Sequence, residues 1–193
     1  MPQKLILPIN HCRITAAYKN KNYLKLGLGQ HFGCDYTSID ASKVVFASGR
    51  GKVLTQGWDD VLGYVICIHY PNAILKDKEV RDVVVRYYHL KMIKVRTGQT
   101  VTKDTVIGTY GDTGKYVTKG AYHLHVEVDT DVKYYAYSPT LTKSSRIILK
   151  GIDTTLNPMD VFYVKTTAPD NQSIIKANYD TVSNEDLHYL TIK

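Results

Sequence analysis

Apolar and polar residues alternate with a period of two along most of the chain. This period is typical of β-strands with one buried face, because successive side chains of a strand point to opposite sides. Gly, Asn and Asp separate the alternating segments as turn residues do, and no window indicates a long, capped helix. The pattern predicts strands at residues 44–47, 51–57, 63–70, 83–90, 106–110 and 122–129. We therefore expect an all-β fold, a curled antiparallel sheet or open barrel.

One domain at residues 1–165, followed by a tail or linker at residues 166–193, is the predicted organisation. A chain of 193 residues is long enough to bury roughly 70% of its unfolded surface. After about residue 165 the composition changes to Thr, Asn, Asp and Ser, with one apolar pair at Ile174 and Ile175. No apolar run approaches the roughly 20 residues that a membrane-spanning helix needs. We expect no membrane insertion.

The charge balance narrows the class of partner. Lys and Arg number 25 against 18 Asp and Glu, a net charge of +7, which favours nucleic acid, anionic lipid or anionic wall polymers. The basic residues are scattered, as on a solvated surface. Three cysteines (Cys12, Cys34 and Cys67) leave one unpaired and form no Cys-x-x-Cys pair, so neither a disulfide scaffold nor a thiolate zinc site is predicted. The N-terminal apolar stretch is too short for a signal peptide, and we expect none.

The strongest candidate for chemistry is the strand that contains His123 and His125. Alternation places these two imidazoles on one face, with Glu127 next along, while the apolar residues between them face a core. Neutral His is the commonest zinc ligand, and a catalytic zinc takes three protein ligands and leaves one position for water. Two imidazoles on one face indicate either a metal site or a coincidence of alternation.

Two weaker signals precede that strand. His31 and Asp35 are separated by three residues that include a glycine, a spacing that can wrap one metal ion. In residues 83–90, alternation places His89 on one face with Val83, Val85 and Tyr87; a lone His at a strand end is usually structural. The other histidines lack such partners and are interpreted as structural or solvated: His11, His69 and His188.

Taken in order, the three signals resemble the lysostaphin-type (LytM-like) zinc endopeptidases of bacterial cell walls. That family carries a His-x-x-x-Asp pair, a Tyr-x-His-Leu strand and a His-x-His strand. They match here as His31 with Asp35, as Tyr87-Tyr88-His89-Leu90, and as His123-Leu124-His125. The resemblance covers about residues 27–164. It implies a curled sheet that forms a substrate groove.

The resemblance also implies a role for each matched residue. His31, Asp35 and His125 would hold Zn²⁺, and His89 and His123 would be the catalytic pair beside the attacking water and the scissile carbonyl. Family members use a Tyr upstream of the first ligand as an oxyanion helper, and Tyr23 is the nearest candidate. Two segments depart from the family pattern and leave substrate preference open: a larger groove-rim loop at residues 115–122 and an extra excursion at residues 131–153.

The implied function is hydrolysis of peptide cross-links or stem peptides of bacterial peptidoglycan. We expect a phage or prophage lysin, carried on a virion or released by a holin, or a domain exported within a larger chain. The expected partners are the wall peptide and anionic wall polymers rather than nucleic acid. The alternatives are a catalytically silent wall-binding or phage tail module on the same fold, and a biotinyl or lipoyl carrier, for which Lys91 would have to sit at a tight turn.

Overall fold

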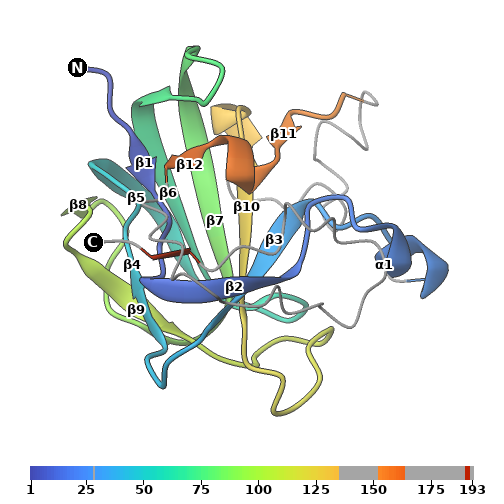
Figure 1. Cartoon of the computed structure of the whole chain (residues 1–193). Helices are drawn as coiled ribbons and strands as arrows, with labels where there is room; N and C mark the ends of the chain where they lie inside the picture. The colour runs from blue at the N-terminus through green and yellow to red at the C-terminus, as the bar shows by residue number, and fades with distance from the viewer. Residues whose placement is uncertain (28, 135–151, 164–189, 192–193) are drawn as a thin grey trace.

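An antiparallel sheet of eleven strands, curled on itself, carries the fold (Figure 1). The structure is a computed structural model that describes residues 1–27, 29–134, 152–163 and 190–191. The strands of this sheet are β2 (His11–Ala16), β3 (Gly33–Ser38), β4 (Val44–Phe46), β5 (Gly51–Asp59), β6 (Gly63–Ile74), β7 (Val80–Ile93), β8 (Thr100–Val101), β9 (Val106–Tyr110), β10 (Leu124–Asp129), β11 (Thr155–Leu156) and β13 (Leu190–Thr191).

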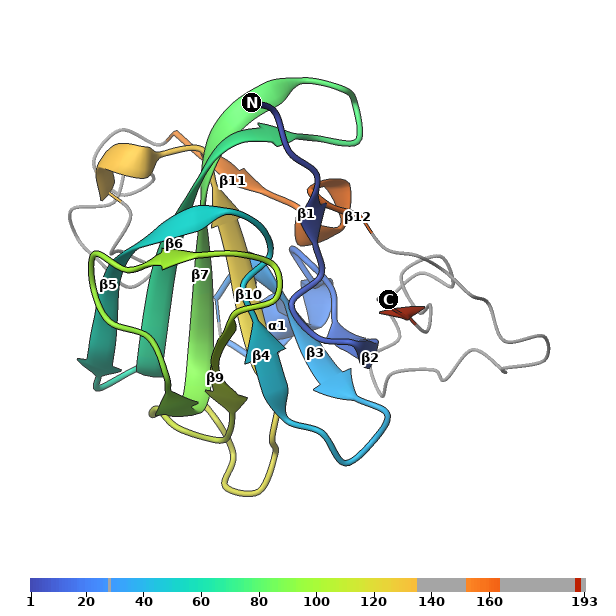
Figure 2. The same ribbon diagram turned by 90° about the vertical axis from the view of Figure 1, so that its left-hand side faces the viewer.

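The order of the strands explains the curl. The main path runs β13-β2-β3-β10-β7-β6-β5-β8, and β9 leaves it by pairing with both β7 and β4. Figure 2 shows β4 and β9 turned across the face of the long central strands. A separate parallel pair, β1 (Leu5–Ile6) with β12 (Phe162–Tyr163), lies beside this face. The helical segments are α1 (Lys21–Lys25), η1 (Val132–Tyr134) and η2 (Pro158–Asp160).

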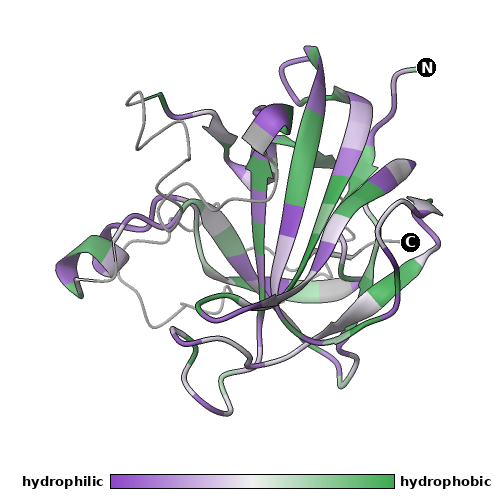
Figure 3. Ribbon diagram, turned by 180° about the vertical axis from the view of Figure 1, so that it is seen from behind, coloured by the Kyte–Doolittle hydropathy of each residue, from purple (hydrophilic) through white to green (hydrophobic). Residues whose placement is uncertain are grey.

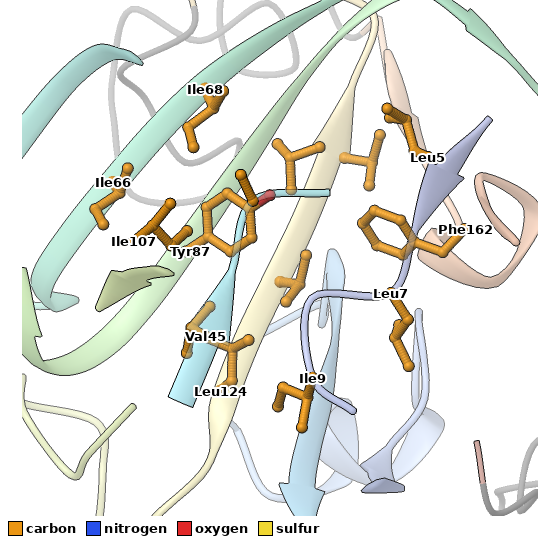
Figure 4. Packing of buried hydrophobic residues seen from close by; sticks show 14 of the residues in the cluster. Leu5, Leu7, Ile9, Val45, Ile66, Ile68, Tyr87, Ile107, Leu124 and Phe162 are labelled. Carbon is orange, nitrogen blue, oxygen red and sulfur yellow. The ribbon is translucent and has the colours of Figure 1, made fainter. Parts of the chain in front are cut away.

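The hydrophobic core fills the inside of the curl. Side chains from the long strands, such as Ile66 and Leu124, belong to one cluster with Leu5 of β1 and Phe162 of β12, and all four are fully buried (Figure 4). Apolar and polar residues alternate along the long strands in Figure 3, as the period-two pattern requires. Burial of this apolar face stabilises the sheet and fixes which side chains point away from the core.

The predicted all-β class and antiparallel sheet are confirmed, and the predicted strand at residues 106–110 has its exact bounds. β6 and β7 are longer than predicted, whereas β10 begins two residues later. β2 and β3 were not predicted, although apolar residues alternate with polar ones along both: Cys12, Ile14 and Ala16 are buried in β2, and Cys34 and Tyr36 in β3. Within the described part of the chain, no helix is long and apolar enough to cross a membrane.

The predicted division at residue 165 stays a prediction. Of residues 166–193 only Leu190 and Thr191 are described, and they pair with β2. Most of the predicted excursion at residues 131–153 lies outside the described residues. Lys91 lies inside β7 rather than at a tight turn, which removes the feature that a carrier domain requires.

Candidate metal centre

Two neighbouring strands bring His31, Asp35 and His125 together. Asp35 of β3 and His125 of β10 are direct register partners, and His31 lies two residues before β3. The Oδ1 atom of Asp35 is 2.8 Å from His125 Nδ1 and 3.2 Å from His31 Nε2, and the two nitrogens are 3.0 Å apart. One ligand atom from each residue lies within 4.8 Å of the others, so the three could hold a single metal ion.

The chemistry of this donor set fits zinc. Two imidazole nitrogens and one carboxylate oxygen are a ligand set of catalytic zinc sites, which keep a further position open. The ring of His31 is oriented from behind, because its Nδ1 lies 2.8 Å from the carbonyl oxygen of Ala17 and donates to it. Nε2 of His31 is then left to face Asp35 and His125. All three residues are buried, with exposed fractions of 4%, 4% and 9%.

Gly33 leaves space for His125, the third candidate ligand. A Cβ atom at this position would lie 2.7 Å from His125 Nε2 and 2.3 Å from the carbonyl oxygen of Val126. Both distances are shorter than atoms tolerate, so any larger residue would displace β10 or the His125 ring. The glycine between the first two candidate ligands therefore allows the close packing of β3 on β10.

His125 is held on its other side by Tyr88 and Glu127. Its Nε2 atom is 3.4 Å from Glu127 Oε1. The Tyr88 ring stacks on the imidazole with 5.5 Å between centroids and 8° between planes, and the Tyr88 hydroxyl donates to Glu127 Oε2 at 3.1 Å. A ligand imidazole commonly has its second nitrogen bonded to a carboxylate, which fixes the ring orientation. We call Tyr88, Glu127 and Arg86 the His125 clamp.

Arg86 supplies the positive charge of the His125 clamp. Its guanidinium is buried, with Nη2 3.0 Å from Asp129 Oδ2 and Nη1 3.5 Å from Glu127 Oε2. A buried carboxylate is costly unless a charge or hydrogen bonds compensate it. Arg86 therefore allows Glu127 to remain ionised behind the candidate ligand.

The surroundings of the site shift the pKa values of His125 and His89 in opposite directions. Burial disfavours the charged form of His125, but hydrogen bonds and charges from Asp35 and Glu127 outweigh burial and raise its pKa to about 9. Burial and the neighbouring charges of His125 and His123 lower the pKa of His89 to about 3. Burial alone would raise the pKa of Asp35, but the surrounding histidines hold that pKa well below its usual value. At neutral pH and without a metal, His125 is therefore protonated, whereas His89 is neutral.

His89 reaches the site through a β-bulge, which the sequence pattern did not predict. The register of β6 and β7 shifts between Tyr64 and Ile66, and His89 has a φ of 60°. The extra residue places Tyr88 and His89 on the same side, although they are consecutive. Tyr87 faces the core and shares hydrogen bonds with Ser48 and Tyr70. The prediction that His89 shares a face with Val83, Val85 and Tyr87 is therefore wrong.

His89 and His123 lie together at the mouth of the site. Their ring centroids are 5.0 Å apart, and the His89 ring is 5.9 Å from that of His125. Nδ1 of His89 is 2.9 Å from the carbonyl oxygen of Thr113, and Nδ1 of His123 is 2.9 Å from that of Ala121. A carbonyl oxygen only accepts, so in each neutral ring Nδ1 carries the hydrogen and Nε2 carries the lone pair.

Tyr23 also reaches the centre. It belongs to the short helix α1, its ring stacks on His31 with 4.3 Å between centroids, and its hydroxyl donates to Asp35 Oδ2 at 2.8 Å. Of the remaining histidines, His69 bonds Asp82 at 3.0 Å, away from this cluster. His11 lies in β2, and His188 lies outside the described residues.

An open groove of about 820 Å³ contains the cluster. One wall comes from β2 and the segment before β3, another from the tip of the β5–β6 hairpin. The loop at residues 115–122 was expected to rim the groove, and six of its residues line it: Tyr116, Val117, Thr118, Gly120, Ala121 and Tyr122.

Sequence comparison places this geometry in a family. Residues 29–137, more than half of the chain, match the family described as peptidase family M23. The chain belongs to peptidase family M23. The matched range contains His31, Asp35, His89, His123 and His125.

This M23 domain is similar to a peptidoglycan endopeptidase over part of that protein's length. It is 28% identical over 123 residues to the peptidoglycan DD-endopeptidase ShyC of Vibrio cholerae serotype O1, a match that covers 62% of this chain and 25% of that protein. The chain therefore spans about a quarter of the length of this curated relative.

Solved structures share the fold of this M23 domain. A zinc-containing peptidase from Vibrio cholerae superposes with a TM-score of 0.53 at 24% identity, covering 66% of this chain and 37% of that one. The solution structure of lysostaphin gives a TM-score of 0.51 at 23% identity, covering 77% and 49%. The predicted resemblance to lysostaphin-type peptidases is thereby confirmed at the level of family and fold.

Proposed function

We propose that this protein is a zinc-dependent endopeptidase that hydrolyses peptide cross-links or stem peptides of bacterial peptidoglycan. The observation that carries the proposal is the buried His31, Asp35 and His125 cluster with His89 and His123 beside it, inside an open groove. Membership of peptidase family M23 and the likeness to a peptidoglycan endopeptidase support the same substrate class.

In this proposal His31, Asp35 and His125 hold the zinc ion. When bound, zinc acts as a Lewis acid that makes water more acidic and polarises a carbonyl group. The His125 clamp fixes the ring so that Nδ1 points at Asp35 and His31. The hydroxyl of Tyr23 holds the second oxygen of Asp35, which leaves Oδ1 as the oxygen that faces both histidines.

In the same proposal, His89 and His123 carry out the proton transfers of peptide hydrolysis. Each presents an Nε2 lone pair, because its Nδ1 hydrogen is donated to a backbone carbonyl. One imidazole takes a proton from the attacking water. The other orients that water by accepting a hydrogen bond or, once its Nε2 is protonated, donates to the oxyanion of the tetrahedral intermediate. In the metal-free protein the pKa of His89 is about 3, so this ring is neutral at neutral pH and its Nε2 lone pair is available to accept a hydrogen bond from water.

We further propose that the protein serves as a phage or prophage lysin. Its net charge of +7 supports contact with the anionic polymers of the target wall. Such contact is electrostatic, so binding to walls should weaken as salt concentration rises.

The proposed function is tested with purified walls of different cross-link chemistry. The protein as purified should release new amino groups from walls, lose this activity on chelation and regain it when zinc is added. Mass spectrometry of the released fragments identifies the bond. A fully metal-free sample that still releases fragments would contradict the proposal. Binding to walls without release of amino groups would favour the catalytically silent module.

A further inference from the structure

Two aromatic side chains are exposed together on the β5–β6 hairpin. Trp58 is 56% exposed and Tyr64 is 40% exposed. They are direct partners across the hairpin, and their rings meet edge to face with 5.0 Å between centroids and 76° between planes. Trp58 is the single tryptophan of the chain. Large aromatic rings left in water forgo the hydrophobic free energy of burial, so a paired and exposed set indicates a contact surface.

This aromatic pair is held in place before any ligand arrives. The indole Nε1 of Trp58 donates to Asp60 Oδ1 at 2.9 Å, and Asp59 Oδ1 accepts from the backbone of the hairpin tip. Gly63, with a φ of 76°, packs so closely on Thr113 that a Cβ atom would lie 2.1 Å from Thr113 Oγ1. A preorganised surface loses little conformational entropy on binding.

The same hairpin forms a wall of the groove. Val61 and Leu62, at the tip between the two aromatic residues, line the groove. The carbonyl oxygen of Leu62 accepts from the backbone N–H of His89 at 3.0 Å. Figure 2 shows the tip at the lower left, at the same end of the sheet as the loop that follows β9. Trp58 and Tyr64 do not themselves line the groove, and alternation places Tyr64 on the face of β6 that carries Ile66. A polymer seated in the groove would therefore reach the aromatic pair by passing over the hairpin tip at Val61 and Leu62.

We propose that Trp58 and Tyr64 form a sugar-binding platform for the glycan strand to which the cleaved peptide is attached. The proposal rests on the proposed function, in which the substrate is a peptide borne on a polymer of N-acylated amino sugars. A pyranose ring has an apolar face of C–H groups that packs on an aromatic ring, and polar edges that bond carboxylates and hydroxyls. Asp60 and the Tyr64 hydroxyl supply those polar partners beside the Trp58 ring.

The single tryptophan makes direct binding measurable. Peptide-free glycan strands, titrated into the wild-type protein, should cause a saturable change in tryptophan emission, whereas free stem peptide should not. Tyr64→Ala keeps the reporter and should weaken glycan binding about tenfold. The control is Val80→Ala, a 48% exposed apolar residue at the opposite end of the β6–β7 pair, which should bind like the wild type. No saturable change with glycan, or a change with stem peptide alone, would overturn the proposal.

A second measurement tests the platform on whole walls. Trp58→Ala should lower wall binding and wall hydrolysis about tenfold, and should lower hydrolysis of a soluble cross-linked peptide much less. Trp58→Phe should restore most of the lost wall binding, because a ring is again present. Equal losses on walls and soluble peptide, or unchanged wall binding in Trp58→Ala, would overturn the platform. If the wild type binds glycan strands but cuts no peptide, the proposed function fails and the platform stands.

Discussion

The ring of Tyr88 lies parallel to the imidazole of His125, and the hydroxyl of the same tyrosine donates to the carboxylate that faces His125 Nε2. One side chain thus restrains the ring plane of a candidate ligand and also orients the group behind it. Since Tyr88 and His125 are register partners on β7 and β10, the sheet itself sets this arrangement. The pairing of β10 with β7 therefore positions the side chains that restrain His125.

Replacing a candidate ligand should remove the metal. His125→Ala deletes one of three donors, so the zinc content of the purified protein should fall well below about one ion per chain, and activity should fall with it. Elemental analysis and wall-release rates on the same sample check both expectations. Thermal stability is measured in parallel to separate loss of metal from loss of fold. Full zinc occupancy in His125→Ala would contradict the assignment.

Replacing either of the outer histidines should have a different effect. His89→Ala and His123→Ala leave His31, Asp35 and His125 in place, so zinc content should stay near that of the wild type. Turnover should fall roughly 10²–10⁴-fold, the usual loss for a positioned acid–base group. If both were only structural, the variants would melt at lower temperature and keep their activity per folded molecule. Loss of zinc from His123→Ala with retention in His125→Ala would reverse the two roles.

The His125 clamp should tune metal affinity without contributing a ligand. Tyr88→Phe keeps the stacked ring and removes the hydroxyl that donates to Glu127, so zinc affinity should fall about tenfold. Glu127→Gln removes the charge that faces His125 Nε2 and should cost 10–100-fold. Competition with a chromophoric chelator measures both values without reference to catalysis. An unchanged affinity in Glu127→Gln would show that the contact at 3.4 Å has no influence on the ion.

The metal-free protein should be most stable near pH 6.5. His89 is neutral in the folded state and has a pKa of about 3, so below pH 6.5 the unfolded chain binds the extra proton and stability falls. His125 has a folded-state pKa of about 9; its contribution is fully present below pH 6.5 and is lost as pH rises through 9. The loss on the alkaline side amounts to about 3 kcal/mol.

Chemical denaturation of chelated protein between pH 4 and 10 measures this profile. In His125→Asn, the alkaline fall assigned to His125 should disappear, while the acid side assigned to His89 remains. A wild-type profile that rises steadily from pH 6.5 to 9 would contradict the raised pKa of His125.

Much of this site could be predicted from the sequence, because local patterns of alternation and spacing identify several of its residues. The alternation in residues 123–128 correctly separates His125 and Glu127 from the apolar residues that face the core. The spacing of His31 and Asp35 likewise indicated a site. The roles of Tyr88 and Arg86 were not predicted, because in an apolar strand a tyrosine is normally interpreted as a core residue and an arginine as a surface residue. Their partners Glu127 and Asp129 are about forty residues away, and only strand register reveals the pairing.

Because of the bulge at Tyr88 and His89, the position of His89 in the site depends on the number of residues in this stretch of β7. Three steps along β7 oppose two along β6, from Tyr87 to Leu90 against Ile66 to Tyr64. Deleting one residue here would restore even pairing and rotate His89 toward the apolar interior, although every side chain type needed for chemistry would survive. An insertion or deletion in this stretch is therefore more damaging than most substitutions, and a relative can retain the histidines yet be inert through a change in strand length alone.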